Sequence, residues 1–291
     1  MAQAAIESEL TIATAVSKLG ELLAPIPNFT LNVTNEVVGR SAVVKVPVVG
    51  TASGADGAAR EYNYTDGYNL KADSEVSSLD VDVVECIKPF QLTDNDMNKS
   101  PITLASFAKQ NAHEFGRFLV NKIFKAVDAA SGTGSQTKTA ATMTITQVKG
   151  MAEDLDENGA PEDRSLLLNA AVNSKLMPSS IETFGAGVLE SGRFSNLYGM
   201  RVYPTTCNVS GSGKAHSFAC SSDAIVIVNR QPEVSGTSTL EEYTPFTIDG
   251  VGIQCAYRRY YDPAKGQHFG AFTSMFGAGV AKPKHIAKVV A

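Results

Sequence analysis

The sequence has little of the positive charge that binding to a phosphate backbone requires. Its 25 lysines and arginines are outnumbered by 30 aspartates and glutamates, the formal net charge is −5 at pH 7, and no run of lysine or arginine occurs. Proteins that read nucleic acids normally carry a concentrated basic surface. The composition therefore argues against that class.

Signals for membrane insertion or secretion are also missing. No stretch reaches the ~18 consecutive apolar residues of a spanning helix, and Glu7 and Glu9 stand where a signal peptide has a basic segment. We therefore expect neither a membrane span nor a signal peptide.

Motifs of metal sites and of nucleophilic catalysis are absent. The four cysteines are scattered without a C-x-x-C pair, the four histidines never lie at H-E-x-x-H spacing, and no G-x-S-x-G elbow occurs. We expect buried free thiols, no metal, no cofactor and no recognisable catalytic residue. A triad built from distant residues leaves no such motif, so an enzyme stays open as an alternative.

The sequence does contain one long helix pattern with a start signal and a stop signal. Ser100 and Pro101 form a start signal, Gly132 and Gly134 a stop signal, and we expect a helix over residues 101–131. Apolar residues recur between them at steps of three and four: Leu104, Phe107, Ala108, Phe115, Leu119, Ile123, Ala126 and Ala130. About 29 helical residues span roughly 43 Å, which fits a core helix of an α+β enzyme as well as a structural rod.

The segment before this helix predicts an arm and a ribbon. Residues 6–19 have a short amphipathic pattern that Gly20 and the prolines at 25 and 27 close, and its apolar face fits either its own body or a neighbouring copy. Residues 42–49 and 76–87 read as the two strands of one hairpin. Such a ribbon is marginal in water by itself, so we expect it to lie across another element.

The ribbon's connection is far longer than a normal hairpin turn. Residues 50–74 are rich in Gly, Ala, Asp and Tyr, and Tyr62, Tyr64 and Tyr68 are the amphipathic rings that interfaces favour. The alternative interpretation is a surface loop that contains tyrosines by chance.

The second half of the chain reads as a mixed α/β region followed by a hairpin. Thr144 and Gln147 form a capping box, Asn169 can cap a further helix, and short strands are expected at 165–168, 200–205, 217–220 and 225–229. Residues 250–277 form a second hairpin around the turn Asp262-Pro263-Ala264-Lys265-Gly266. We expect a polar linker at 131–141 and a short, weakly basic tail from Ala281.

The order of these elements resembles the major capsid proteins of tailed double-stranded DNA bacteriophages, with the Hong Kong 97-type capsid fold. Local phrases that resemble this family lie at residues 164–169, 196–202 and 250–276. The resemblance implies an α+β fold with an N-terminal arm (1–39), an extended β-hairpin loop (40–88), a peripheral domain (89–139 and 246–291) with the spine helix 101–131, and an axial domain (140–245).

The resemblance implies a structural protein and not an enzyme. The chain would self-assemble into hexamers and pentamers of an icosahedral shell that encloses viral double-stranded DNA, without cofactor, metal or membrane. Its location would be the virion, after assembly in the bacterial host cytoplasm. The implied partners are copies of itself, scaffolding, portal and decoration proteins, and the packaged DNA in non-specific proximity.

Candidate contact residues follow from the ribbon, the second hairpin and the helix. The expected inter-subunit contacts are Arg60, Tyr62, Tyr64, Tyr68, Lys71, Asp262, Pro263 and Lys265. The helix side chains expected to face the lumen or a neighbouring subunit are Lys109, Arg117 and Lys125. The resemblance implies that some relatives are crosslinked through a lysine of the extended loop, and Lys71 is the only lysine of the connection 50–74.

The remaining expectations concern N-terminal processing, scaffolding and alternative functions of the chain. We expect no N-terminal cleavage, and a separate scaffolding protein or none. The first alternative is an encapsulin-like compartment shell, which shares the fold but encloses cargo enzymes. The second is a soluble α/β hydrolase whose site has no recognisable motif.

Overall fold

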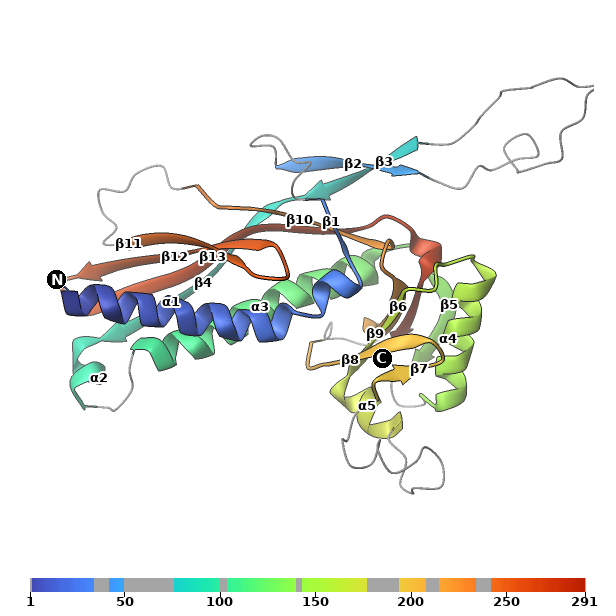
Figure 1. Cartoon of the computed structure of the whole chain (residues 1–291), viewed down its shortest axis with the longest axis horizontal. Helices are drawn as coiled ribbons and strands as arrows, with labels where there is room; N and C mark the ends of the chain where they lie inside the picture. Colours follow the sequence, from blue (N-terminus) through green and yellow to red (C-terminus); the bar gives the residue numbers. More distant parts are fainter. Residues whose placement is uncertain are drawn as a thin grey trace, which may run out of the picture.

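The computed structural model describes residues 2–33, 42–49, 76–99, 104–139, 143–176, 194–207, 215–233 and 242–290. In this part, helices pack on two six-stranded sheets, and a two-stranded ribbon forms a separate hydrogen-bonded sheet (Figure 1). The α-helices are α1 (Ala2–Leu23), α2 (Asp94–Lys99), α3 (Leu104–Ala129), α4 (Ile145–Glu157) and α5 (Ala170–Leu176). The mixed helix and sheet fold expected from the sequence is confirmed.

The first sheet forms the long body of the molecule. Its strand order is β1-β10-β13-β12-β11, and β4 pairs with β13. The strands are β1 (Leu31–Asn32), β4 (Val84–Thr93), β10 (Ile225–Arg230), β11 (Glu242–Ile248), β12 (Ile253–Asp262) and β13 (Gln267–Val280). The expected hairpin over 250–277 is confirmed as β12–β13, which Gly266 turns at a φ of +58°.

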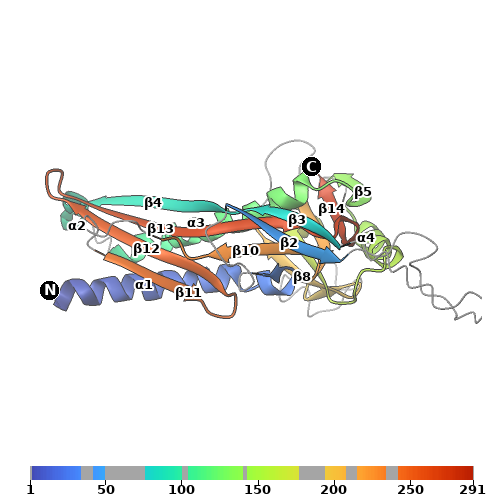
Figure 2. The same ribbon diagram turned by 90° about the horizontal axis from the view of Figure 1, so that it is seen from above.

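The second sheet lies at one end of this body, together with α4 and α5 (Figure 2). Its strand order is β5-β14-β9-β6-β8-β7. The strands are β5 (Gly134–Thr139), β6 (Arg164–Asn169), β7 (Asn196–Leu197), β8 (Met200–Thr205), β9 (Ala215–Ser221) and β14 (Ile286–Val290). Every residue of β6 is buried, as expected for a short central strand.

The expected long helix is present as α3, whose apolar stripe packs against the first sheet. The Phe115 ring stacks on Phe272 of β13 with 6.5 Å between ring centroids, and Leu119 and Ile123 are fully buried. Helix α3 ends at Ala129, two residues before the expected end, and Gly132, part of the expected stop signal, follows with a φ of +77°. The expected start signal at residues 100 and 101 lies outside the described residues.

Helix α1 packs along α3 of the same chain (Figure 1). The sequence left open whether the apolar face of this segment packs on its own chain or on a neighbouring copy, and the described side chains of α1 pack on their own chain. The two helices approach closely at Gly116, where a Cβ atom would lie 2.6 Å from Cδ2 of Leu22 and 3.2 Å from Cδ2 of Leu19. The expected stop at Gly20 is wrong. The helix continues to Leu23 because Leu19 and Leu23 are both fully buried, and the segment from Pro25 onward then ends it.

The predicted ribbon is present as β2 (Val43–Val49) paired with β3 (Val76–Asp82) in antiparallel register. It lies across the first sheet, on the face opposite α1 and α3 (Figure 1). Val46 and Val81 share a buried apolar cluster with Val226 and Val228 of β10. The expectation that the ribbon rests on another element is therefore confirmed.

One expected strand of this ribbon is in fact two strands. The chain between Val76 and Ile87 breaks at Val83, because β3 pairs with β2 whereas β4 pairs with β13. The amide of Val83 donates to the carbonyl of Ala42 at 2.8 Å and closes the ribbon at this point.

Local helix signals in the second half are confirmed. The amide of Thr144 donates to Oε1 of Gln147 at 2.9 Å, and α4 begins at the next residue. Asn169 caps α5, because its Oδ1 accepts from the amide of Ala171 at 3.0 Å.

Two expectations about irregular segments are wrong. The expected linker 131–141 contains β5, and the expected tail contains β14, which pairs with β5 on one side and β9 on the other. Strand β5 has the polar sequence GSQTKT without apolar alternation, so main-chain pairing with β14 defines it.

The residues that form the two sheets differ from the ranges expected for the peripheral and axial domains. Strands β10 and β11 lie at least partly within residues 140–245 but belong to the first sheet, and β5 and β14 lie in the ranges expected for the peripheral domain but belong to the second. None of the helices among the described residues is both long and apolar enough to cross a membrane.

Candidate assembly interface

The turn between β12 and β13 contains three of the predicted contact residues: Asp262, Pro263 and Lys265. It lies beside α2, at the end of the molecule opposite the second sheet (Figure 2). The carbonyl of Asp262 accepts from the amide of Lys265 at 3.2 Å, and Oδ1 of Asp262 accepts from the amide of Ala264 at 3.1 Å. These bonds give the turn a defined shape, as its Pro and Gly positions predict.

Asp94, at the start of α2, fixes this turn to the neighbouring strand. Its amide donates to the carbonyl of Gly266 at 3.0 Å, and its Oδ2 accepts from the Tyr261 hydroxyl at 2.6 Å. Its Oδ1 lies 3.4 Å from Nε2 of His268. A Cβ atom on Gly266 would lie 3.1 Å from Oδ2 of Asp94, and the φ of +58° is in the left-handed region that favours glycine.

The surface beside this turn carries aromatic rings and charges of both signs. The Tyr260 and Phe269 rings stack with centroids 4.8 Å apart, and Tyr260 is 43% exposed. Lys265 is exposed, and its Nζ lies 3.6 Å from Oδ2 of Asp262. Amphipathic aromatic rings surrounded by polar groups are typical of protein–protein contacts.

The three predicted helix residues have different surroundings. Lys109 and Lys125 are exposed, and Lys109 lies next to the α1 residues Lys18 and Glu21 at a shallow depression between the helices. Arg117 is half-buried, and its Nη2 donates to the carbonyl of Thr206 at 3.5 Å, so it contacts the segment after β8 of its own chain. All three residues remain predictions for a lumen or neighbour contact.

The predicted contact residues of the ribbon loop lie outside the described residues. They are Arg60, Tyr62, Tyr64, Tyr68 and Lys71. Their assignment to an interface stays a prediction.

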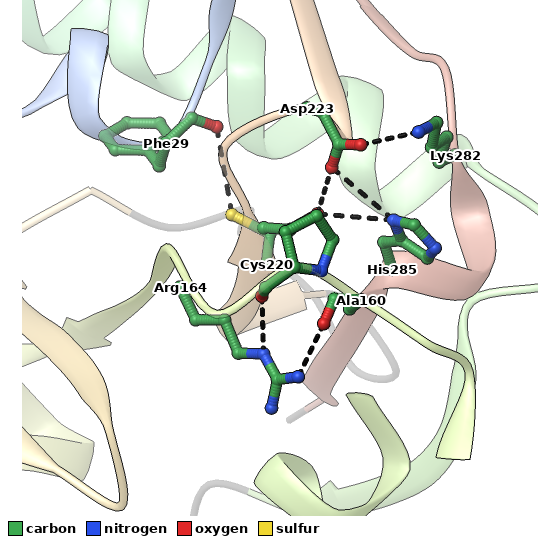
Figure 3. A network of polar contacts seen from close by, with 9 residues as sticks. Phe29, Ala160, Arg164, Cys220, Asp223, Lys282 and His285 are labelled. Atoms are coloured by element: carbon green, nitrogen blue, oxygen red, sulfur yellow. Dashed lines mark hydrogen bonds and ion pairs between the residues drawn. The ribbon is translucent and has the colours of Figure 1, made fainter. Parts of the chain in front are cut away.

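A polar cluster between the two sheets was not predicted from the sequence. It is centred on Asp223, in the turn between β9 and β10, and includes Lys282 and His285 (Figure 3) and also Ser221. Nζ of Lys282 lies 2.5 Å from Oδ2 of Asp223, and Nδ1 of His285 lies 3.4 Å from Oδ1. The Ser221 hydroxyl also donates to Oδ1 of Asp223.

This cluster contains serine, histidine and aspartate without the geometry of a hydrolase triad. In a triad the carboxylate holds one ring nitrogen of histidine and the serine faces the other. Here Ser221 and Asp223 both approach Nδ1 of His285, and Ser221 is fully buried. The arrangement is therefore a structural hydrogen-bond network.

The pKa of Asp223 is lowered from 3.8 to about 2. Partial burial raises this pKa, but the hydrogen bonds from Lys282 and Ser221 and the Lys282 charge outweigh burial and lower it. Because the folded-state pKa is depressed, the stabilising contribution is present above about pH 4 and is lost as the pH falls towards 2.

We predict that the wild-type protein has a larger free energy of unfolding than Asp223→Asn at neutral pH and that this difference disappears in acid. At pH 7 the wild-type free energy of unfolding should be larger by about 1–2 kcal/mol, which allows for solvent screening at the half-exposed Lys282. The difference should shrink between pH 4 and pH 2, where wild-type Asp223 becomes protonated. Urea unfolding at several pH values measures it; a difference independent of pH would contradict the assigned ion pair.

Burial shifts the pKa of several of the cysteine thiols. The four thiols are free and buried, as expected, and burial raises the pKa of Cys86, of Cys220 and, to about 12, of Cys255. Within the described ranges, no cluster of three or more His, Cys, Asp or Glu side chains is arranged to hold a metal ion.

Sequence comparison finds no relative: no protein-family model matches the chain, and no curated protein matches it. Structure comparison does find similar proteins. A chain from Mycobacterium phage Che8 is 15% identical, with a TM-score of 0.56 over 91% of this chain and 90% of that chain. A chain from the capsid of the cyanophage P-SCSP1u is 15% identical, with a TM-score of 0.56 over 90% and 86%.

A particle that is not described as a phage is also similar. A chain of the virus-like particle from Pyrococcus furiosus is 11% identical, with a TM-score of 0.52 over 94% of this chain and 97% of that chain. All three likenesses extend over most of both chains, between 86% and 97%. The chain therefore has the phage capsid protein fold.

Proposed function

We propose that the chain is the major capsid protein of a tailed double-stranded DNA bacteriophage, with the Hong Kong 97-type organisation. It would form hexamers and pentamers of an icosahedral shell, without enzymatic activity. The observation that carries the proposal is the likeness in fold to phage capsid chains over about nine-tenths of the sequence.

The shape of the subunit supports this role. The molecule is long and flat, and the β2–β3 ribbon lies on the outside of the first sheet (Figures 1 and 2). A shell subunit needs several modest contacts, because contacts in a closed lattice reinforce one another while each stays weak enough for errors to dissociate. An elongated body with a protruding ribbon offers such contacts at more than one end.

The domain assignment of the proposal follows strand pairing. The N-terminal arm would be residues 1–39, and the extended loop would centre on β2 and β3 within 40–88. The peripheral domain would be the first sheet with the spine helix α3, along which α1 of the arm packs, and the axial domain would be the second sheet with α4 and α5. The acidic net charge supports a container that does not grip its genome tightly.

The partners and location belong to the same proposal. The chain would contact copies of itself, portal and decoration proteins, a separate scaffolding protein or none, and packaged DNA without sequence preference. It would reside in the virion after assembly in the host cytoplasm.

An encapsulin-like compartment shell is the second candidate, favoured by the likeness to the virus-like particle from Pyrococcus furiosus. The contents of particles isolated from the native source separate the two. Nuclease-protected double-stranded DNA supports the capsid proposal. Particles that enclose a protein cargo and no DNA would overturn it in favour of the compartment.

We predict that Asp94→Ala impairs assembly more than folding. Asp94 is partly exposed, so losing its bonds to Tyr261 and His268 should lower the free energy of unfolding by only about 1 kcal/mol. The β12–β13 turn would lose its fixed shape, and shell yield should fall several-fold. Electron microscopy counts the shells. Glu153→Gln, which removes an exposed ion pair with Lys149 on α4, is the control and should assemble normally.

A further inference from the structure

Two of the connections between the sheets lie side by side, apart from the one that runs through α3. Residues 222–224 connect β9 of the second sheet to β10 of the first, and residues 281–285 connect β13 of the first sheet to β14 of the second. The amides of Ala281 and Lys282 both donate to the carbonyl of Ala224, at 2.8 and 3.2 Å. The two crossings thus form one junction between the sheets.

Asp223 is the side chain that links both crossings. It belongs to the first crossing, and its two carboxylate oxygens contact Lys282 and His285 of the second (Figure 3). The Ser221 hydroxyl, at the end of β9, donates to the same carboxylate and limits its orientation. A carboxylate held by an ammonium group, an imidazole and a hydroxyl has little freedom to rotate, so the two crossings are held in one arrangement.

An aromatic contact holds the second sheet on helix α3. The Phe218 ring of β9 packs edge-on against Phe124 of α3, with 4.9 Å between ring centroids, and both side chains are fully buried. Nζ of Lys288 on β14 also lies 3.4 Å from the carbonyl of Asp128 at the end of α3. The second sheet is thus held on α3 at one point and joined to the first sheet at the Asp223 junction.

We propose that Asp223 is a positioning residue that sets the angle between the two sheets and, through that angle, the curvature of the shell. This inference rests on the proposed capsid function. The sheets lie end to end along the long axis of the subunit (Figure 2), so a change of angle at the junction changes the direction in which one end meets its neighbours. In a closed shell of identical subunits, that change repeats at every copy and alters the diameter.

The test compares shell diameters among variants that stay folded. Asp223→Asn keeps the size of the side chain but removes its charge, and Lys282→Met removes the partner charge. Both should give a broader mixture of diameters by electron microscopy than the wild type. Lys282→Arg keeps a cation at the site and should retain the wild-type distribution of shell diameters. Glu153→Gln, which removes an exposed ion pair distant in sequence from the junction, should leave the diameters unchanged.

A second readout follows the junction directly. In Asp223→Asn, the amides of Ala281 and Lys282 should exchange with deuterium faster, on the order of tenfold, while amides in the centre of α3 stay unchanged. Wild-type shells of one diameter together with identical Asp223→Asn shells would overturn the inference and leave the capsid function standing. A wild-type protein that forms no shell would overturn both.

Discussion

Deletion of residues 54–68 is expected to abolish shell formation and to leave a folded subunit. The deleted stretch contains Arg60 and the three predicted contact tyrosines, whereas the anchorage of the ribbon lies outside it, with Val46 and Val81 packed against Val226. Roughly halving the connection changes its closure free energy by only about 0.6 kcal/mol. Folding should therefore be preserved while contacts with neighbouring subunits are lost.

Two measurements on the same preparation check this expectation. The midpoint of thermal unfolding should stay within a few degrees of the wild-type value, and circular dichroism should show the same helix and strand content. Sedimentation should then find no particles larger than small oligomers. Closed shells formed by the deletion variant would show that this loop is not an essential interface.

Gly277→Ala is expected to displace the ribbon from the first sheet. A Cβ atom at this position would lie 2.6 Å from the carbonyl oxygen of Asp82 and 2.9 Å from Cγ1 of Val81. The first contact is with main chain, so no side-chain rotation relieves it. Overpacking of this kind costs about 1–3 kcal/mol, and here the ribbon has to move away from β13.

A glycine in open surroundings is the matched control. A Cβ atom added to Gly20, within α1, would meet no atom of the described residues within 4 Å, and the helical backbone there tolerates alanine. Gly20→Ala should stabilise the protein by up to about 1 kcal/mol. An electron-microscopy or crystal structure of Gly277→Ala reports whether the ribbon has moved relative to β13. A ribbon that keeps its position over β13, together with normal shells, would contradict the assigned contact.

Elements with local signals were predictable from the sequence. The glycine after α3, the capping box before α4, the Asn169 cap before α5 and the turn between β12 and β13 each act over four or five residues. Their side chains satisfy or constrain nearby main-chain groups, so the pattern itself carries the physical cause.

Elements that depend on distant pairing were not predictable in the same way. Strand β5 is polar and exists through pairing with β14, whose residues come more than 140 positions later. The exchange of strands between the sheets, with β10 and β11 in the first and β14 in the second, has no signature in composition or spacing.

The same distinction explains the candidate site. Turn chemistry identified Asp262, Pro263 and Lys265. The sequence did not predict Asp94, which fixes the β12–β13 turn, or Asp223, which joins the two connections between the sheets. Asp94 bonds to Tyr261 across 167 positions, and Asp223 bonds to Lys282 across 59. A single aspartate beside a turn gives no sequence signal for such a partner.

Sedimentation velocity of the purified protein, with electron microscopy of the same sample, tests the capsid proposal most directly. The proposal predicts megadalton closed shells, or capsomers that close into shells when a scaffolding protein is added. A 30.8 kDa monomer at all protein concentrations, salt conditions and scaffold additions would contradict it.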